Sequence, residues 1–458
     1  MNSRYMQYVA AITSAWLAAC SHMITGWNSP AIAKLTSNDS PIGVTLTDEE
    51  ASWVASIPML GFIAGSVVSS YFTHKFGTKH TLVLSTLPII FSWIVIAITN
   101  SIATLIAMRC LAGFGDGFII TALPLYVGEV TDKDIRGGLT TTISVLNAFG
   151  NVLLYSVGPF ISYTALALLC AAITVIVMIA LVLMPDSPYF LCKKRKQHLT
   201  KKNLKRLLGN NVDEEEFEKR LLEIQLTVST NKNRRLYFKD FYEKRNYRRA
   251  IILITALKLF QHLSGMSALK SYLQTIIQFT ESSISPEISS IIFGFVQIPS
   301  VLLAAFLMDR VGRRWLYISS ALSCATCLMF EALYFFLQQS SSKIVANFLW
   351  LPTLSLTMYL ISAPLGLSSV PFVVIGEVIG SDIKDFASPF STTMGAITSF
   401  LSTKYFLPLS IIYGMHTMFA VYGCTCVIAS IFVFFMLPET KGKSFLEIQE
   451  LLKTKSCC

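Results

Sequence analysis

Apolar residues recur in twelve long runs that divide the chain. The runs lie at about 8–27, 51–72, 80–98, 102–124, 138–158, 164–184, 250–279, 287–308, 315–337, 346–374, 388–412 and 417–437. A membrane-spanning helix needs about 20 predominantly apolar residues, and each run has about that length. One long hydrophilic stretch separates the first six runs from the last six. The pattern therefore predicts an all-α membrane protein with twelve transmembrane helices.

The same pattern predicts four parts. These are an N-terminal six-helix bundle (1–184), a cytoplasmic linker (185–249), a C-terminal six-helix bundle (250–437) and a cytoplasmic tail (438–458). Apolar positions within the linker have a spacing that predicts short amphipathic helices beneath the membrane part. They are Leu204, Leu207, Leu208, Phe217, Leu221, Leu222 and Ile224. The alternative is a solvated linker without such helices.

The composition agrees with a membrane protein and disagrees with a soluble one. The chain is 53% apolar and 14% charged, whereas soluble domains carry about 25% charged residues. Nearly half of its 37 Lys and Arg residues lie in the linker, and the connections on the opposite side hold Lys34 and Lys343 alone. Basic loops stay in the cytoplasm, so both termini and the linker are predicted inside, in a protein of the plasma membrane. The glycosylation acceptor Asn38 then falls in the first outside loop.

The net charge of +10 does not indicate a nucleic-acid partner. The acidic run Asp213–Glu216 interrupts the basic tract of the linker. The basic residues are better explained by membrane topology.

Two stretches echo each other in the two halves of the chain. Glu129 follows the fourth span and precedes Arg136 by seven residues, and Glu377 follows the tenth span and precedes Lys384 by seven. Such pairs of carboxylate and cation suit a gate on the intracellular side that closes and releases. The alternative is that these charges cap helix ends.

A second echo follows the second and eighth spans. The later copy, Asp309–Arg314, combines a carboxylate with Arg310, Arg313 and Arg314 around Gly312, which permits a tight turn. The earlier copy, His74–Lys79, lacks the acid and one base. We assign the later copy to the intracellular gating network.

These motifs resemble those of major facilitator superfamily sugar transporters, most of all the insect facilitated trehalose transporter branch. The resemblance covers the whole chain and rests on Arg109 with Gly113 and Gly115, Glu129 with Arg136–Gly137, Pro185–Tyr189, Gln261–Ala268, Asp309–Arg314, Glu377 and Pro438–Lys443, which includes Glu439. It implies two six-helix bundles of the major facilitator fold, an intracellular helical loop, and a sugar site between the bundles. It also implies that Arg109 and Glu439 belong to the gating network.

The resemblance carries sugar-binding roles to particular polar residues. Gln261 matches a sugar-binding glutamine, while His262 and Ser267 replace a glutamine and an asparagine of the family. Gln297 stands where the family has a sugar-binding asparagine, and Tyr272 is a further candidate. Uncharged amides suit this task because they donate and accept hydrogen bonds at modest desolvation cost. Helix–helix hydrogen bonding is the alternative role for each.

Other positions depart from the family pattern. Phe372 replaces a tryptophan, and Gly395–Ala396 replaces an Asn-Trp pair. Ser144 replaces a glutamine of glucose facilitators, with Asn147 and Asn151 one and two turns further on. These changes enlarge the expected cavity and remove amides, so the substrate is larger than a hexose or the binding function has changed.

One position in the first span bears on whether transport is coupled to protons. Asn28 replaces the aspartate that proton-coupled relatives use, and an amide cannot carry a proton. Asn28 is therefore also a candidate binding residue of a passive carrier. Coupling through Asp116 or Glu331, which lie in spans, is the alternative. Those two acids, and Lys258 and Lys270, match no motif of the family.

The sequence thus predicts a facilitative sugar uniporter that works by alternating access, with trehalose or another small sugar as substrate. The alternatives are a facilitator of another organic solute and a sugar receptor that does not transport. No catalytic residues, metal site, cofactor, nucleic-acid partner or obligate protein partner are predicted. Gly113–Asp116 mimics an intramembrane aspartyl protease, but no second central aspartate exists in the spans.

Overall fold

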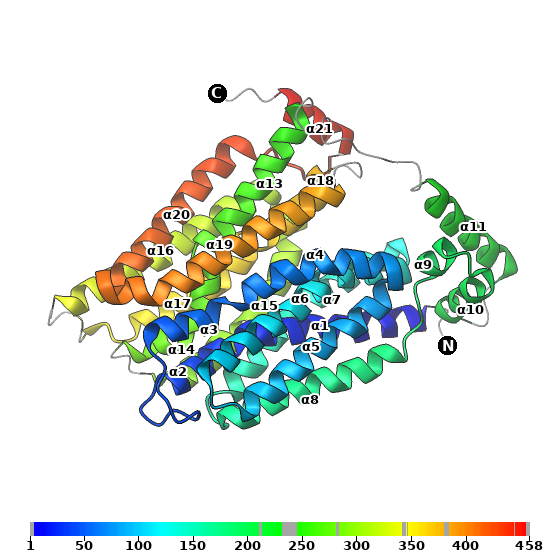
Figure 1. Cartoon of the computed structure of the whole chain (residues 1–458). Helices are drawn as coiled ribbons and strands as arrows, with labels where there is room; N and C mark the ends of the chain where they lie inside the picture. The colour runs from blue at the N-terminus through cyan, green and yellow to red at the C-terminus, as the bar shows by residue number, and fades with distance from the viewer. Residues whose placement is uncertain are drawn as a thin grey trace. The chain divides into compact units, whose positions relative to one another are not determined.

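The chain forms two compact helical units in a computed structural model that describes residues 4–209, 213–230, 245–280, 284–340, 345, 347–379, 384–443 and 445–454. Unit 1 comprises residues 1–24, 60–150 and 164–235, and unit 2 comprises 25–59, 151–163 and 236–458. Every extended regular element of the described residues is a helix (Figure 1). Residues 25–59 and 151–163, from the first half of the chain, therefore pack with the second half.

Unit 1 contains most of α1 (Tyr5–Gly26), α4 (Pro58–Phe76) and α7 (Lys133–Val157), together with α5 (Thr78–Ile98), α6 (Ile102–Val130), α8 (Tyr163–Val182), α9 (Pro188–Lys193), α10 (Gln197–Leu208) and α11 (Glu214–Thr230). Close helix packing needs glycine at the α4–α6 contact. A Cβ on Gly61 would lie 2.0 Å from the Cys110 carbonyl oxygen, and one on Gly65 would lie 2.0 Å from that of Phe114.

Unit 2 contains α2 (Asn28–Leu35), α3 (Asp48–Ser56), α13 (Arg245–Leu263), α14 (Met266–Gln278), α15 (Pro286–Val311), α16 (Arg313–Gln339), α17 (Leu351–Leu365), α18 (Ser369–Val378), α19 (Lys384–Tyr413), α20 (Met415–Met436) and α21 (Phe445–Thr454). In this unit α2 packs against α14, and α3 packs against α19. These two contacts join 25–59 to the second half of the chain.

The helices confirm the twelve predicted spans. Eleven helices or helix pairs of the described residues are long and apolar enough to cross a membrane. They leave large apolar side chains on the surface, such as Ile98 and Ile176, as a lipid-facing helix does. The twelfth span, α19, has lower hydropathy because many of its residues are Ser or Thr, of which Ser391, Thr398 and Ser399 are buried. The protein is therefore a multi-pass membrane protein.

Several predicted spans are interrupted. The runs 51–72, 250–279 and 346–374 each correspond to two helices in succession, and the run 8–27 forms α1, which α2 follows after Trp27. Pro58 begins α4 directly after α3, because proline cannot donate the hydrogen bond that would continue a helix. Broken helices at membrane depth free backbone groups for side chains and substrates.

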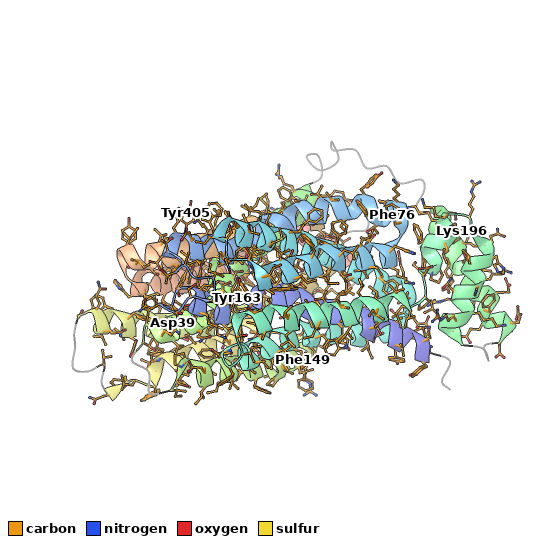
Figure 2. The ribbon with its side chains drawn as sticks, turned by 60° about the horizontal axis from the view of Figure 1, so that its bottom comes forward. Asp39, Phe76, Phe149, Tyr163, Lys196 and Tyr405 are labelled. Carbon is orange, nitrogen blue, oxygen red and sulfur yellow. The ribbon has the colours of Figure 1, made fainter. Side chains whose placement is uncertain are left out.

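The described part of the linker between residues 188 and 230 forms a small helical cluster, not a solvated segment without helices. Helices α9, α10 and α11 lie close together in Figure 1, and Lys196 marks the turn between α9 and α10 in Figure 2. Leu204, Leu208, Phe217, Leu221 and Ile224 form its core, as the spacing predicts. The expectation for Leu222 is wrong: its side chain is 55% exposed. On α11, Leu221 and Ile224 lie three residues apart on the face that enters this core, whereas Leu222 lies on a different face.

Arg220 ties this cluster to the rest of unit 1. Its guanidinium forms ion pairs with Asp132 and, at 2.8 Å, with Glu223. Burial alone would lower the pKa of Arg220, but the hydrogen bond from Glu223 and the charge of Asp132 outweigh burial and raise it. Asp132 also accepts a hydrogen bond from Gln7 at 3.0 Å, so α1 and α11 meet on one carboxylate.

Candidate functional site

The break between α13 and α14 organises the candidate site in unit 2. Gly265 adopts φ +82°, the left-handed region, and begins α14. A Cβ there would lie 2.3 Å from the Tyr422 ring, so this position requires glycine for conformation and for space. The Ser264 hydroxyl donates to the Gln261 carbonyl at 2.8 Å, and Tyr359 donates to the Ser264 carbonyl at 3.2 Å. The backbone groups freed by the break are thus satisfied by side chains.

Gln261 lies at the end of α13 with one side of its amide available. Its Oε1 accepts a hydrogen bond from the Lys258 ammonium at 3.3 Å. Its amide nitrogen has no hydrogen-bond partner among the described residues. Lys258 also lies over the Phe372 ring of α18, 3.3 Å from the centroid. Gln261, Lys258 and Phe372 therefore meet, and a buried amide donor remains available there.

His262 and Ser267, the two departures from the family pattern, contact each other. His262 Nδ1 lies 2.9 Å from the Ser267 hydroxyl, which accepts a hydrogen bond from Ser399 of α19 at 2.8 Å. A Cβ on Gly395 of α19 would lie 3.3 Å from the His262 ring. The hydroxyl-rich α19 therefore faces the break in α13–α14. Ser399 was not predicted, although the many Ser and Thr residues of its span were a usable signal.

Gln297 lies on α15 and contacts Asn151. Its amide nitrogen donates to the Phe293 carbonyl at 3.0 Å, and its Oε1 accepts from Asn151 at 3.3 Å. Both residues are buried. A Cβ on Gly294 would lie 3.2 Å from the Val152 backbone, so a glycine lets the helices approach closely enough for this amide pair. Asn151 thus forms a hydrogen bond with Gln297, a site residue that the sequence predicted.

Asn28 and Tyr272 make contacts within the protein. The Asn28 amide donates to the Ala55 carbonyl and to the Ser271 hydroxyl, both at 3.1 Å. The Tyr272 hydroxyl donates to the Thr403 carbonyl at 3.2 Å, and its fully buried ring stacks on Phe406. Both residues support the helix contacts of unit 2.

Polar contacts tie α2 and α3 to the second half of the chain; we call them the α2–α3 seam. The Lys404 ammonium of α19 donates to the Ser52 hydroxyl at 2.8 Å and lies 4.2 Å from the centroid of the Trp53 ring. The backbone N–H of Gln274 donates to the Ser29 hydroxyl at 3.1 Å. Sequence reasoning missed these partners, because nothing along the chain pairs positions this far apart.

A Lys404→Met variant is expected to loosen the α2–α3 seam. Hydrogen bonds from a charged donor contribute about 1.5–3 kcal/mol, so the seam should open at least about tenfold more often. The measurement is the thiol-labelling rate of a cysteine placed at the fully buried Ala51, in a chain without native cysteines. Lys34→Met is the control, because Lys34 donates to the Gly158 carbonyl at 2.6 Å and not to α19. Equal labelling in Lys404→Met and the parent would contradict the role of Lys404.

A second polar cluster lies at the turn between α15 and α16. Arg313 forms an ion pair with Glu377 at 2.8 Å, and Glu377 also accepts from the Thr440 hydroxyl at 2.6 Å. Glu439 accepts from the backbone N–H groups of Arg313 at 3.0 Å and Arg314 at 3.2 Å. The sequence motifs around Arg313, Glu377 and Glu439 therefore meet in space; we call them the Glu377 cluster.

The other charges of that turn have different environments. Asp309 lies 3.5 Å from Arg313, and its side chain is 83% exposed. Arg310 packs over the Phe306 ring at 4.1 Å, and Arg314 packs over the Phe434 ring at 4.9 Å. Gly312 has φ +95°, and a Cβ there would lie 2.6 Å from the Glu439 carboxylate. Glycine at this turn therefore makes room for the acid.

The earlier copy repeats this geometry with a hydroxyl in place of the guanidinium. Gly77 has φ +91°, and Thr78, one residue later as Arg313 follows Gly312, donates to Glu129 at 2.7 Å. Lys79 pairs with Asp186 at 3.4 Å. The earlier copy thus keeps the turn, and its Thr78 contacts Glu129, the counterpart of Glu377.

The remaining candidates lie elsewhere in the chain. Arg109 is fully buried in unit 1 and donates to the Ile24 carbonyl at 2.7 Å. Ser144 is exposed and Asn147 is half-buried on α7. Asn38 is exposed beside Asp39, which Figure 2 labels in the loop after α2. The side chains of Arg136 and Lys384 lie outside the described part of the structure.

The chain is similar to a described family and to known transporters. Residues 13–452 match the family described as Sugar (and other) transporter. The chain is 31% identical over 435 residues to the facilitated trehalose transporter Tret1 of Bombyx mori, covering 94% of this chain and 84% of that protein. It is 29% identical over 446 residues to Tret1 of Polypedilum vanderplanki, covering 97% of this chain and 88% of that protein.

Solved structures with the same fold are similar over nearly the whole chain. The inward open conformation of the xylose transporter XylE from E. coli has a TM-score of 0.77 at 19% identity, covering 97% of this chain and 98% of that one. The proton:xylose symporter XylE bound to 6-bromo-6-deoxy-D-glucose has a TM-score of 0.73 at 19% identity, covering 99% of this chain and all of that one. These likenesses establish the major facilitator fold.

Proposed function

Because the chain belongs to the Sugar (and other) transporter family, whose members are transporters, we propose that it is a facilitative sugar uniporter. Its substrate is trehalose or another small sugar, as the names of the Tret1 relatives suggest. Those names do not favour the two alternatives, a carrier of other solutes and a receptor that does not transport. The family membership makes an enzymatic function unexpected.

The available amide of Gln261 carries this proposal. It lies beside the break in α13–α14, and the next residue, His262, contacts the Ser267 hydroxyl, which Ser399 also contacts. The Phe372 ring, which Lys258 contacts, is exposed. A sugar needs hydrogen bonds for its hydroxyls and an apolar surface for its C–H faces, and this set of groups offers both. Gln297 and Asn151 add a second amide pair.

The residues at the α2–α3 seam support passive transport. Asn28 occupies the place of the coupling aspartate, and its amide donates to protein oxygens. Asp116 accepts a hydrogen bond from Ser21, and both Glu331 oxygens lack a hydrogen-bond partner among the described residues. Neither acid matches a motif of the family, so neither is assigned a coupling role.

Alternating access assigns roles to the two polar regions of unit 2. The α2–α3 seam is proposed as the gate at the extracellular end, and the Glu377 cluster as part of the intracellular gating network. This orientation places both termini and the linker in the cytoplasm and a glycan on Asn38. The N-terminal bundle would then span 1–184 and the C-terminal bundle 250–437, in a protein of the plasma membrane.

Uptake by proteoliposomes containing the purified full-length protein tests the function. We expect saturable uptake of a radiolabelled sugar from a panel of trehalose, hexoses and polyols, with no effect of a protonophore. Gln261→Ala should lower uptake about 10- to 100-fold, because a lost polar contact leaves substrate hydroxyls unpaired. Gln225→Ala on the exposed face of α11 is the matched control. Failure of well-folded protein to take up any sugar would reject the proposal.

A further inference from the structure

Two lysines and a histidine surround the break between α13 and α14. Lys258 is 4% exposed and lies four residues before His262, on the same face of α13. Lys270 lies on α14, and both ammonium groups act electrostatically on the His262 ring. Three nitrogen bases thus gather within membrane-spanning helices, beside the Gln261 amide.

The charges of the two lysines are not neutralised by the described residues. The contacts of Lys258 are the Gln261 amide oxygen and the Phe372 ring, and neither carries a full negative charge. The Lys270 ammonium has no hydrogen-bond or ion-pair partner among the described residues, and no described Asp or Glu acts on either lysine. Lys404 and Lys34, by contrast, each donate to two protein oxygens.

Two charges of one sign within membrane-spanning helices need a reason to persist. A lysine within a membrane helix is costly, and such residues pair with partners or mark the path of a substrate. Here the protein supplies no anion to the two lysines among its described residues. A substrate with a negative charge would supply the missing partner each time it enters, because charge-assisted hydrogen bonds to carboxylate and phosphate are strong.

We infer that the sugar accepted by this site is anionic, and that Lys258 and Lys270 bind its carboxylate or phosphate group while Gln261 binds hydroxyls. The inference rests on the proposed sugar transport and narrows its substrate class. It differs from the neutral disaccharide named for the relatives. His262 assists by donating to the anion or by holding Ser267 in place.

Uptake and binding of charged and neutral sugars test the inference. The probes are glucuronate for the carboxylate, glucose 6-phosphate for the phosphate, and glucose and trehalose as neutral sugars, with full-length protein in proteoliposomes. We expect at least one anionic sugar to enter more than tenfold faster than glucose. The Lys258→Met/Lys270→Met variant should lose at least tenfold of that uptake, a larger factor than it loses for glucose or trehalose. Lys205→Met on the exposed face of α10 is the control for charge.

Thermal unfolding with each sugar separates this inference from the proposed function. An anionic sugar should raise the unfolding midpoint of the parent by at least about 2 °C and should not raise that of the double variant. Such binding without any uptake would reject transport and keep the anion site. Uptake of neutral sugars with no binding of either anion would reject the anion site and keep transport. The double variant alone should unfold no earlier than the parent, because it loses two charges that have no anionic partner among the described residues of these membrane-spanning helices.

Discussion

A Gly265→Ala variant is expected to lose at least about 100-fold of the sugar uptake per protein in the membrane. The left-handed conformation costs alanine about 1–2 kcal/mol, and its Cβ would lie 2.3 Å from the Tyr422 ring. That ring cannot withdraw freely, because the Tyr422 hydroxyl and the Ser402 hydroxyl lie 3.1 Å apart. Strain and clash together amount to about 3 kcal/mol, on the order of 100-fold in an equilibrium.

Gly138→Ala on α7 is the matched control for this substitution. A Cβ at Gly138 would have no atom within 4 Å, and alanine stabilises a helix interior relative to glycine. Uptake and the thermal unfolding midpoint of Gly138→Ala should therefore equal or exceed those of the parent. If Gly265→Ala behaved like this control, the break would not depend on the backbone of Gly265.

A Glu377→Gln variant is expected to lower the free energy of unfolding by about 2 kcal/mol, and uptake by about tenfold. The Glu377 and Arg313 side chains are 25% and 12% exposed, so the loss is smaller than for a fully buried pair but larger than for a surface pair. Without the Glu377 carboxylate, Arg313 keeps the exposed Asp309, 3.5 Å away, as an acidic partner. The Thr440 hydroxyl then donates to a neutral amide oxygen, which is a weaker acceptor.

Asp309→Asn tests whether charge alone explains that loss. Asp309 faces the same guanidinium, but its exposed position predicts a change below about 0.5 kcal/mol. Thermal unfolding followed by a thiol-reactive dye reports both variants, because the buried Cys324 and Cys426 become accessible on unfolding. Equal effects of Glu377→Gln and Asp309→Asn would show that the Glu377 cluster does not depend on this ion pair.

Hydrophobic periodicity predicted the spans well, because lipid imposes the same length on each of them. It could not predict the interruptions in three of them. Gly265 leaves the helix only because the Tyr422 ring and the Ser264 side chain accommodate the break. The polarity of α19 was visible in the sequence, but not its contacts: Ser399 meets Ser267 and Lys404 meets Ser52 across 132 and 352 residues.

The repeated motifs also combine features that the sequence predicts with contacts that only the tertiary structure decides. Glu129 and Glu377 occupy equivalent positions in the sequence, and both turns contain a glycine with positive φ. Which partner each acid takes depends on the residue after that glycine, a threonine in one copy and an arginine in the other. The linker gives a simpler case, because its spacing predicts an apolar face, whereas the packing of α10 on α11 leaves Leu222 outside it.

The sequence by itself determined that the protein spans a membrane with twelve helices, since apolar length and the sorting of charge depend on no particular neighbour. It also determined which polar residues enter the membrane. Only the tertiary structure decided which of them meet. Lys258 contacts Gln261 and Phe372, while Lys404 donates to Ser52 at the α2–α3 seam, although both are lysines in apolar spans. The difference arises because a buried charge takes its character from the groups around it, and these come from helices far apart in the chain.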